Sequence, residues 1–424
     1  MFKKLFNGAK VIFIGTVISK ALAYLFTWLG TRLGPFEFGI YSLGFTIAAF
    51  VSANSLLGMD AAVTKFAGHY KVKNDSNKIS AVITSVFKTS FVFSVFLAVL
   101  LFIFAPYVAH VCHGQAQLVA VIRLFAVSIP FSVATNLLTE VFRAYQQMDY
   151  YIFFRDVLDR TFRLLLLFVF HLIGYTLFGF VGAAVVSVVL TTLLILVVIK
   201  KKVFDFKIVS DRTVDKEIWS FSMPRFVSSW FLTIMVWFGT ILIGIYLSPV
   251  EVGLYTSAVL LTTGFVVVSD SIFTPLYPML IDDVANNKID SFLSNSKKLY
   301  KVITLIFIIP ILTIFLLSKE IMLVLFGREY LAAGAILFAL SVKALFDTYS
   351  QVPRSILTAT SNTKVEMYLN FVVSILFVAL CVVLIPKYGM IGAAWSGLIS
   401  SAIIFLVSHE IAFRRINYDR TAPS

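Results

Sequence analysis

The chain has 424 residues, of which 59% are apolar and 13% are charged, with 35 Lys and Arg against 22 Asp and Glu. A soluble domain is nearer half apolar and a quarter charged, so this composition excludes an ordinary soluble protein. The net charge of +13 would suit a nucleic-acid partner, but the cations flank apolar runs that approach or exceed the ~20 residues of a membrane span. The sequence therefore predicts a polytopic α-helical membrane protein.

Pro, Gly and charged residues divide the chain into twelve apolar stretches, each expected to form a membrane-spanning helix. The first run, after Lys10, is too long for a signal peptide and is expected to be retained. The helices are predicted near residues 10–32, 37–66, 81–106, 117–141, 153–173, 177–199, 219–246, 251–281, 299–318, 331–352, 365–385 and 389–411.

Lys and Arg gather on one side of these predicted spans. With a cytoplasmic N-terminus, the inner segments hold 24 of these cations and the outer segments hold four. The positive-inside rule predicts this asymmetry, so we expect a multi-pass protein of the cytoplasmic membrane with both termini in the cytoplasm. Cations that face an anionic leaflet also account for the net charge, so no nucleic-acid partner is expected.

The chain carries an internal repeat whose offset drifts between 210 and 215 residues. Leu33–Tyr41 (LGPFEFGIY) recurs as Leu247–Tyr255 (LSPVEVGLY), and Gly179–Ala184 recurs as Gly389–Ala394. Pro lacks an N–H and suits the first turn of a helix, where an acidic residue is also favoured. Each copy of the nine-residue motif is therefore predicted to be a tight turn that starts a helix.

Each half of the chain holds six predicted helices in the same order, so both halves begin on the same side of the membrane. We expect an all-α integral membrane fold of two parallel six-helix lobes, residues 1–205 and 206–424, joined by the basic segment Lys200–Glu217. Such an arrangement is typical of a transporter whose site lies between the lobes near the middle of the membrane.

Three motifs carry a family resemblance: LGP-x-E-x-G-x-Y at Leu33–Tyr41 with its repeat, Gly58–Ala67, and Phe221–Pro224. In this order they resemble the polysaccharide-export branch of the multidrug/oligosaccharidyl-lipid/polysaccharide (MOP) flippase superfamily. The resemblance covers nearly the whole chain. It implies a V-shaped, two-lobe fold like that of multidrug and toxic-compound extrusion (MATE) transporters. It also implies alternating-access translocation of a lipid-linked saccharide, with undecaprenyl diphosphate as the expected carrier, through a cationic cavity.

Cations within the predicted spans are the first candidates for binding a lipid diphosphate, because an unpaired cation facing lipid is costly. Lys20 lies about ten residues, or ~15 Å, into the first helix. Arg225 follows Pro224 early in the seventh helix, and Lys65 lies near the inner end of the second. We expect all three cations to bind substrate, although each could instead reach the headgroups or pair with a distant carboxylate.

Polar residues of the second and eighth helices complete the candidate site. Asp60 could pair with Lys65 or bind a cation, and Asn54 could line the cleft or bond across helices. Asp270 is the candidate for coupling to Na⁺ or H⁺, with a partner role for one of the cations as the alternative. By contrast, the series of i,i+4 charges from Arg155 to Arg163 suggests structural ion pairs.

Two other functions remain to be weighed. A drug/cation antiporter of the MATE type would rely on acidic residues, whereas the deep helices here hold more cations than acids. A membrane glycosyltransferase or polymerase would need sizeable outer loops with catalytic acids, which this chain lacks, so we expect no enzyme.

No cofactor or metal site is expected beyond a coupling ion. Expected partners are the lipid-linked saccharide, membrane lipids, and glycosyltransferases or a polymerase of the same pathway.

Overall fold

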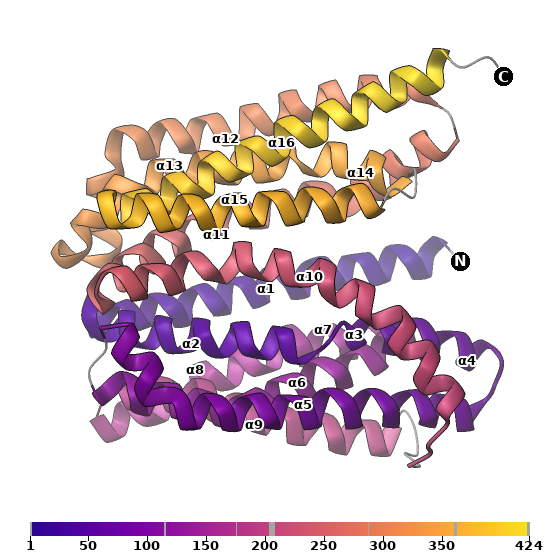
Figure 1. Ribbon diagram of the computed structural model, residues 1–424, viewed down its shortest axis with the longest axis horizontal. Helices are drawn as coiled ribbons and strands as arrows, with labels where there is room; N and C mark the ends of the chain where they lie inside the picture. Colours follow the sequence, from indigo (N-terminus) through magenta and orange to yellow (C-terminus); the bar gives the residue numbers. More distant parts are fainter. Residues whose placement is uncertain are drawn as a thin grey trace. The chain divides into compact units, whose positions relative to one another are not determined.

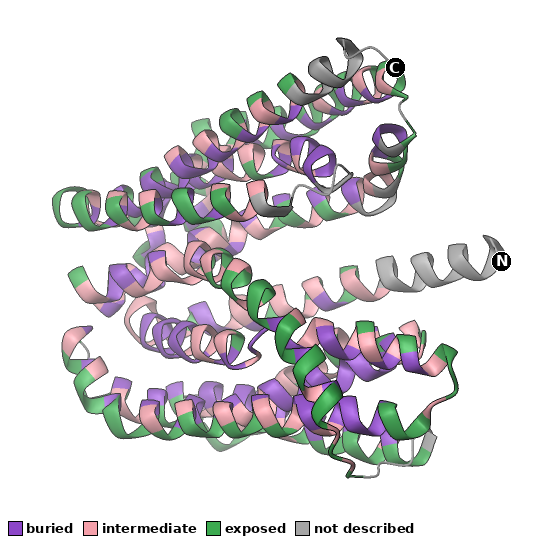
Figure 2. Ribbon diagram, turned by 45° about the vertical axis from the view of Figure 1, so that its right-hand side comes forward, coloured by how far each residue is buried: buried purple, intermediate pink, exposed green. Residues whose placement is uncertain are grey.

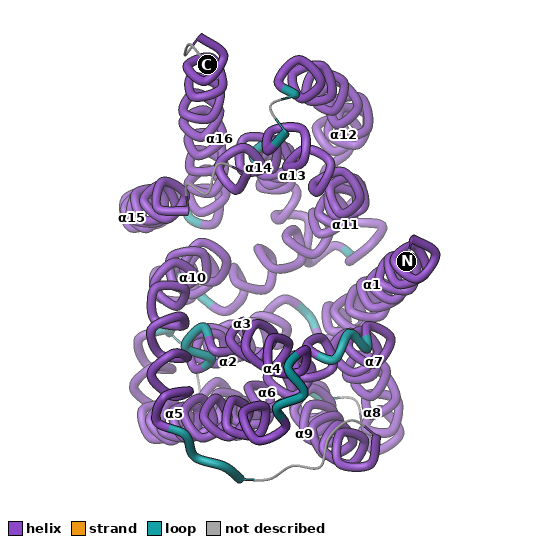
Figure 3. Tube along the Cα trace, turned by 90° about the vertical axis from the view of Figure 1, so that its right-hand side faces the viewer, coloured by secondary structure: helices purple, strands orange, loops and turns teal. Residues whose placement is uncertain are grey.

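The structure, a computed structural model, describes residues 2–113, 116–174, 176–202, 208–286, 288–359 and 363–421. Every regular element in these ranges is helical (Figure 3), which confirms the all-α fold. The α-helices are α1 (Phe2–Gly30), α2 (Pro35–Ser55), α3 (Met59–Ala62), α4 (Gly68–Val72), α5 (Ser76–Val111), α6 (Ala116–Ala144), α7 (Met148–Ile152), α8 (Asp159–Gly174), α9 (Leu177–Lys202), α10 (Arg212–Tyr246), α11 (Pro249–Ala285), α12 (Ile289–Phe326), α13 (Gly334–Tyr349), α14 (Gln351–Ala359), α15 (Thr363–Tyr388) and α16 (Met390–Thr421).

Four short elements with other helical geometries complete the described part of the chain. Two are 3₁₀ turns, η1 (Thr31–Leu33) and η4 (Arg328–Ala333). The other two are π-helices, η2 (Val63–Ala67) and η3 (Phe153–Leu158). A π-helix is rare and is frequently found at a functional site.

Ten helical segments of the described residues are long and apolar enough to cross a membrane. The two remaining predicted spans coincide with α1 and with η3 followed by α8. Large apolar side chains are exposed along the outer faces of these helices (Figure 2), for example Phe96 at 55%, Ile309 at 69% and Leu316 at 72%. Such exposure is unfavourable in water but suits contact with lipid.

The chain divides into two compact units. Unit 1 comprises Met1–Thr233 with Ser248–Val250, and unit 2 comprises Ile234–Leu247 with Glu251–Ser424. Helix α10 therefore contributes residues to both units. The lobe boundary predicted at residues 205 and 206 lies outside the described residues, so it stays a prediction.

Both copies of the nine-residue motif start a helix, as predicted. Pro35 is the first residue of α2 and Pro249 is the first residue of α11, with an acidic residue in each first turn. Before Pro35, Gly34 has φ 89°, which favours glycine. Before Pro249, the Ser248 hydroxyl accepts a hydrogen bond from the Val250 N–H at 3.2 Å instead. The two copies thus start their helices by different means.

The single helix predicted over 37–66 is wrong, because the chain breaks after Ser55. Leu57 and Gly58 have φ values of 51° and 71°, and the chain continues through α3, η2 and α4 (Figure 1). A Cβ atom on Gly58 would lie 2.7 Å from the Ser222 carbonyl oxygen and 3.0 Å from the Phe226 nitrogen. The break therefore lets the backbone of α10 pack directly against position 58.

Helix α6 is central to the core of unit 1. It packs against α2, α5 and α9, which run alongside it in Figure 1. Val133, Leu137 and Phe142 of α6 are fully buried. In unit 2, α16 packs against both α13 and α15. A polar residue on the inward faces of α6 is consequently held among three neighbouring helices.

Candidate functional site

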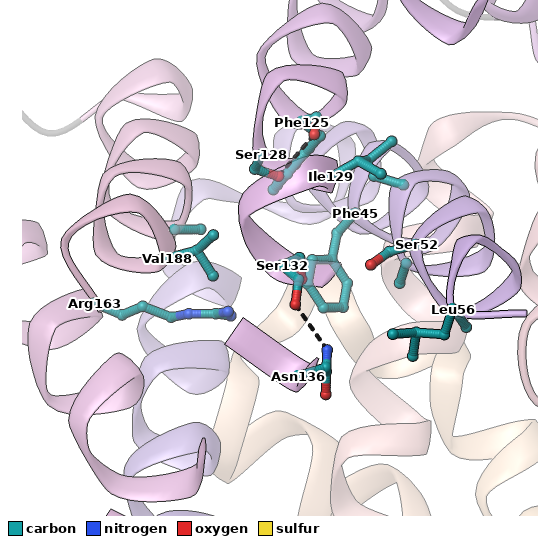
Figure 4. A pocket seen from close by; sticks show the side chains of 14 residues that line it. Phe45, Ser52, Leu56, Phe125, Ser128, Ile129, Ser132, Asn136, Arg163 and Val188 are labelled. Carbon is teal, nitrogen blue, oxygen red and sulfur yellow. Dashed lines mark hydrogen bonds between the residues drawn. The ribbon is translucent and has the colours of Figure 1, made fainter. Parts of the chain in front are cut away.

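A pocket of about 290 Å³ lies within unit 1, among α2, α6, α8 and α9 (Figure 4). Helix α2 contributes Ser52, and α6 contributes Ser128, Ser132 and Asn136. Arg163 of α8 also lines the pocket, and its side chain reaches across from the side opposite Ser52. The pocket therefore combines one guanidinium with several small polar groups.

An ion pair holds Arg163 in place. Its Nη2 lies 2.8 Å from Oδ2 of Asp159, one helical turn earlier, and the two side chains are only 19% and 13% exposed. On the far side of the carboxylate, Ser187 of α9 donates to Asp159 Oδ1 at 2.9 Å. The Nε of Arg163 is buried and makes no hydrogen bond with any group that the structure describes. The guanidinium thus has a fixed position and an unused donor.

The polar wall of α6 offers acceptors. The Ser128 hydroxyl donates to the Phe125 carbonyl at 2.7 Å, and the Asn136 amide nitrogen donates to the Ser132 carbonyl at 2.9 Å. These bonds use hydrogens, so the hydroxyl and amide oxygens keep lone pairs for a ligand. A permanently charged guanidinium opposite such acceptors suits an anionic or polyhydroxylated group.

Arg225 belongs to the segment of α10 that packs against Gly58, and Lys65 lies beside that segment. Lys65 is exposed on the π-helix η2, and its Nζ lies 4.0 Å from the centre of the Phe221 ring and 5.2 Å from that of Phe66. Arg225 is exposed one helical turn after Phe221. These two predicted substrate ligands are therefore associated with one short stretch of the same helix.

The other predicted ligands are spread over three helices. Lys20 on α1, Asn54 on α2 and Asp60 on α3 are each partly buried. The Asn54 amide donates to the Phe50 carbonyl at 2.7 Å, next to pocket residue Ala53. Asp270 is exposed on α11 in unit 2. Their roles in transport stay predictions. Among the described residues, no cluster of three or more His, Cys, Asp or Glu could hold a metal ion.

The pocket residues of α6 were not predicted from the sequence, and Arg163 was expected to have only a structural role. Two predicted ion pairs are present, Asp159–Arg163 at 2.8 Å and Asp156–Arg160 at 3.2 Å. Arg155, however, pairs with Glu140 at 3.3 Å rather than with the predicted Asp159. A usable signal was the i,i+4 spacing of Ser128, Ser132 and Asn136, which places three polar groups on one face of an apolar helix.

Comparisons with known proteins bear on the function. A family model described as "Polysaccharide biosynthesis protein" matches residues 5–283. An uncharacterized membrane protein of Methanocaldococcus jannaschii is 24% identical over 416 residues, covering 93% of this chain and 95% of that protein. A Shigella flexneri protein whose name proposes O-antigen transport is 22% identical over 384 residues, covering 87% of this chain and 88% of that protein.

The fold is also shared with a solved transporter structure. The inward-facing conformation of a multidrug resistance MATE family transporter of the MOP superfamily superimposes with a TM-score of 0.78 at 15% identity, covering 96% of both chains. At this identity the likeness concerns the fold alone. The family model, however, matches more than half of the chain. The chain accordingly belongs to the polysaccharide biosynthesis protein family and is a multi-pass membrane protein whose fold is shared with a MATE transporter.

Proposed function

We propose that this protein is a flippase that moves a lipid-linked oligosaccharide or polysaccharide precursor across the cytoplasmic membrane by alternating access. The carrier lipid is undecaprenyl diphosphate. The cations of the inner segments face the cytoplasm, where such a precursor is assembled, so both termini are cytoplasmic. Glycosyltransferases or a polymerase of the same pathway are the expected partners of the transporter.

The pocket lined by Arg163 is the structural observation that best supports a lipid-linked saccharide as the substrate. The guanidinium of Arg163 lines the pocket. Its partner Asp159 does not line the pocket, and its other carboxylate oxygen accepts a hydrogen bond from Ser187. A ligand in the pocket therefore meets the cationic guanidinium of Arg163, whose charge is balanced by Asp159 outside the pocket lining, together with hydroxyl and amide oxygens. A diphosphate needs the first of these and a saccharide needs the second.

The predicted ligands have distinct roles in this scheme. Lys20, Lys65 and Arg225 neutralise the diphosphate while it crosses a region of low dielectric constant. Asn54 and Asp60 hydrogen-bond the sugar. Asp270 binds Na⁺ or H⁺ and couples transport to the gradient of that ion.

Substitution of Lys20 tests the proposal directly. In proteoliposomes that hold a fluorescent undecaprenyl-diphosphate oligosaccharide, the wild type should expose the sugar to an impermeant glycosidase. Lys20→Ala should reduce this rate by about 10-fold or more, since a charge-assisted contact contributes roughly 1.5–3 kcal/mol. Lys387→Ala removes an exposed cation at the end of α15 and serves as the matched control. Transport by Lys20→Ala at the wild-type rate would remove Lys20 from the site.

The shared fold with a MATE transporter favours drug/cation antiport as the second candidate. The two functions differ in the charge of the substrate. A flippase should bind the lipid diphosphate and ignore ethidium, whereas an antiporter should bind ethidium in competition with Na⁺ or H⁺. Binding titrations of the purified protein with both ligands would decide between them.

A further inference from the structure

A second polar cluster lies in unit 1 where α6 ends, and it is built on Glu140. The Glu140 side chain is only 7% exposed, and its Oε2 accepts a hydrogen bond from the Thr64 hydroxyl at 2.6 Å. Nη1 of Arg143 lies 3.5 Å from Oε2, and Nη1 of Arg155 lies 3.3 Å from Oε1. One buried carboxylate thus holds two arginines.

Both π-helices of the described chain meet at this carboxylate. Thr64 belongs to η2 and Arg155 belongs to η3, so the two segments reach Glu140 from different parts of the sequence. An isolated π-helix is uncommon and is less stable than the α-helix it interrupts. Two of them at one side chain indicate a site with a function beyond packing.

The charges of the cluster do not cancel. A single arginine would neutralise Glu140, but two are present, and their side chains remain 49% and 41% exposed. Both guanidiniums also lie by the Tyr151 ring, with Cζ of Arg143 at 5.6 Å and Cζ of Arg155 at 5.2 Å from its centre. The acid is therefore buried while a pair of planar cationic groups, with one net positive charge, stays accessible. Guanidiniums arranged in this way match the oxygens of a phosphate or diphosphate.

A line of polar residues joins this cluster to the pocket. Asn136 lies one turn before Glu140 on α6, about 6 Å along the helix axis. Ser132 and Ser128 continue the same i,i+4 series into the pocket. A headgroup bound by the arginines would therefore be one helical turn from the first polar group of the pocket wall.

We propose that Arg143 and Arg155 dock the phosphate or diphosphate headgroup of a membrane lipid at the bilayer surface, with Glu140 as the positioning residue. The proposal rests on the proposed function for the side of the membrane and for the lipid substrate. It adds an entry site, distinct from the pocket at Arg163, where the headgroup is captured before it moves inward.

Binding of a short polyprenyl diphosphate tests the site. Full-length protein in nanodiscs of neutral lipid is titrated with farnesyl diphosphate and read by native mass spectrometry. Replacing both arginines by alanine should weaken binding by about 10-fold or more, and replacing both by lysine by about 3-fold, because lysine keeps the charge but loses the planar fork. Arg414→Ala, which removes the exposed partner of Glu410 on α16, should bind as the wild type does.

Glu140→Gln separates positioning from simple attraction. This change raises the net charge of the cluster from one to two, so attraction alone would strengthen binding. If Glu140 positions the guanidiniums, binding should instead weaken by about 3-fold, since two charge-assisted contacts are lost. Tighter binding by Glu140→Gln would overturn the positioning role.

Two further comparisons separate a lipid headgroup from a free diphosphate, and the docking site from the proposed flippase function. Inorganic pyrophosphate should compete with farnesyl diphosphate only at about 10-fold higher concentration, because it lacks the buried chain. Equal competition would overturn docking of a lipid. If the double arginine variants are as stable as the wild type and bind farnesyl diphosphate equally well, the docking site at Arg143 and Arg155 is refuted. This holds even if the wild type transports the lipid-linked saccharide. If the wild type binds farnesyl diphosphate at this site but does not transport the lipid-linked saccharide, only the proposed function is refuted.

Discussion

The two units share a repeat but differ in the helix that follows the nine-residue motif. In unit 1 this helix breaks at Leu57 and Gly58, and the chain continues through a π-helix. In unit 2 the corresponding helix α11 runs without interruption from Pro249 to Ala285. The motif offset of 214 places Ile272 where unit 1 has Gly58. A β-branched residue strongly disfavours positive φ, so Ile272 would be strained in the backbone conformation that Gly58 adopts.

The units differ again in the charge of one pair of repeat positions, on α8 in unit 1 and on α15 in unit 2. A repeat offset of 211 places Asn370 and Ser374 of α15 where unit 1 has Asp159 and Arg163. Asn370 and Ser374 are 2% and 1% exposed, and the Ser374 hydroxyl donates to the Asn370 carbonyl at 2.6 Å. Neutral polar groups thus replace an ion pair. The repeat preserves the order of the helices, while the ionic chemistry of this position belongs to unit 1.

The largest effect is expected from breaking the ion pair of unit 1, either by removing Arg163 alone or by giving both positions the residues of unit 2. Arg163→Ala should lower the free energy of unfolding by about 3 kcal/mol, because Asp159 is left buried without its partner. The double variant Asp159→Asn/Arg163→Ser should regain most of this stability but should still transport about 10-fold more slowly, since the guanidinium is missing. Equilibrium unfolding in mixed micelles and the proteoliposome assay measure the two effects. Full transport by the double variant would show that the pair is only structural.

A smaller effect is expected from adding a methyl group at the break. Gly58→Ala should cost about 2–3 kcal/mol of stability, because it combines positive φ with a clash against the backbone of α10. The matched control is Gly264→Ala in α11, where a Cβ would meet nothing within 4 Å. That change should be neutral or stabilising by up to about 1 kcal/mol, as alanine favours a helix. Equal losses in both variants would refute this account of the break.

The smallest effect on stability is expected at the residues that precede α2 and α11, Gly34 and Ser248. Gly34→Ser should cost about 1–2 kcal/mol, because serine at φ 89° is strained. Ser248→Ala should cost only about 1 kcal/mol, the typical loss of a side-chain cap. Thermal unfolding of both variants measures the difference. A larger loss from Ser248→Ala than from Gly34→Ser would reverse the proposed roles.

Local patterns were sufficient to predict the helical fold and the helix starts. Apolar runs of membrane length and the Pro-x-Glu spacing are properties of short segments, so a single sequence displays them. The break at Gly58 was missed because the surrounding residues also suit a helix. Only the approach of Ser222 and Phe226, more than 160 positions away in the sequence, explains why glycine is needed there.

The candidate site was harder to predict for a related reason. Arg155 has an acid at i+4, the usual sign of a helical ion pair, yet Glu140 on another helix takes its place. Arg163 does pair with the predicted Asp159, but the same spacing serves structural and functional arginines alike. A pocket is formed by side chains from several helices, so its presence beside Arg163 could not be inferred from spacing alone.

The side chains of Ser128, Ser132, Asn136 and Glu140 follow a spiral around α6. Each step of four residues advances about 6 Å and rotates by about 40°, so the series winds through about 120° over about 18 Å. A rigid rod of that length would lose contact with the groups at one end. If the proposed saccharide contacts this series, rotation about its glycosidic bonds would let successive sugar units follow the spiral of α6.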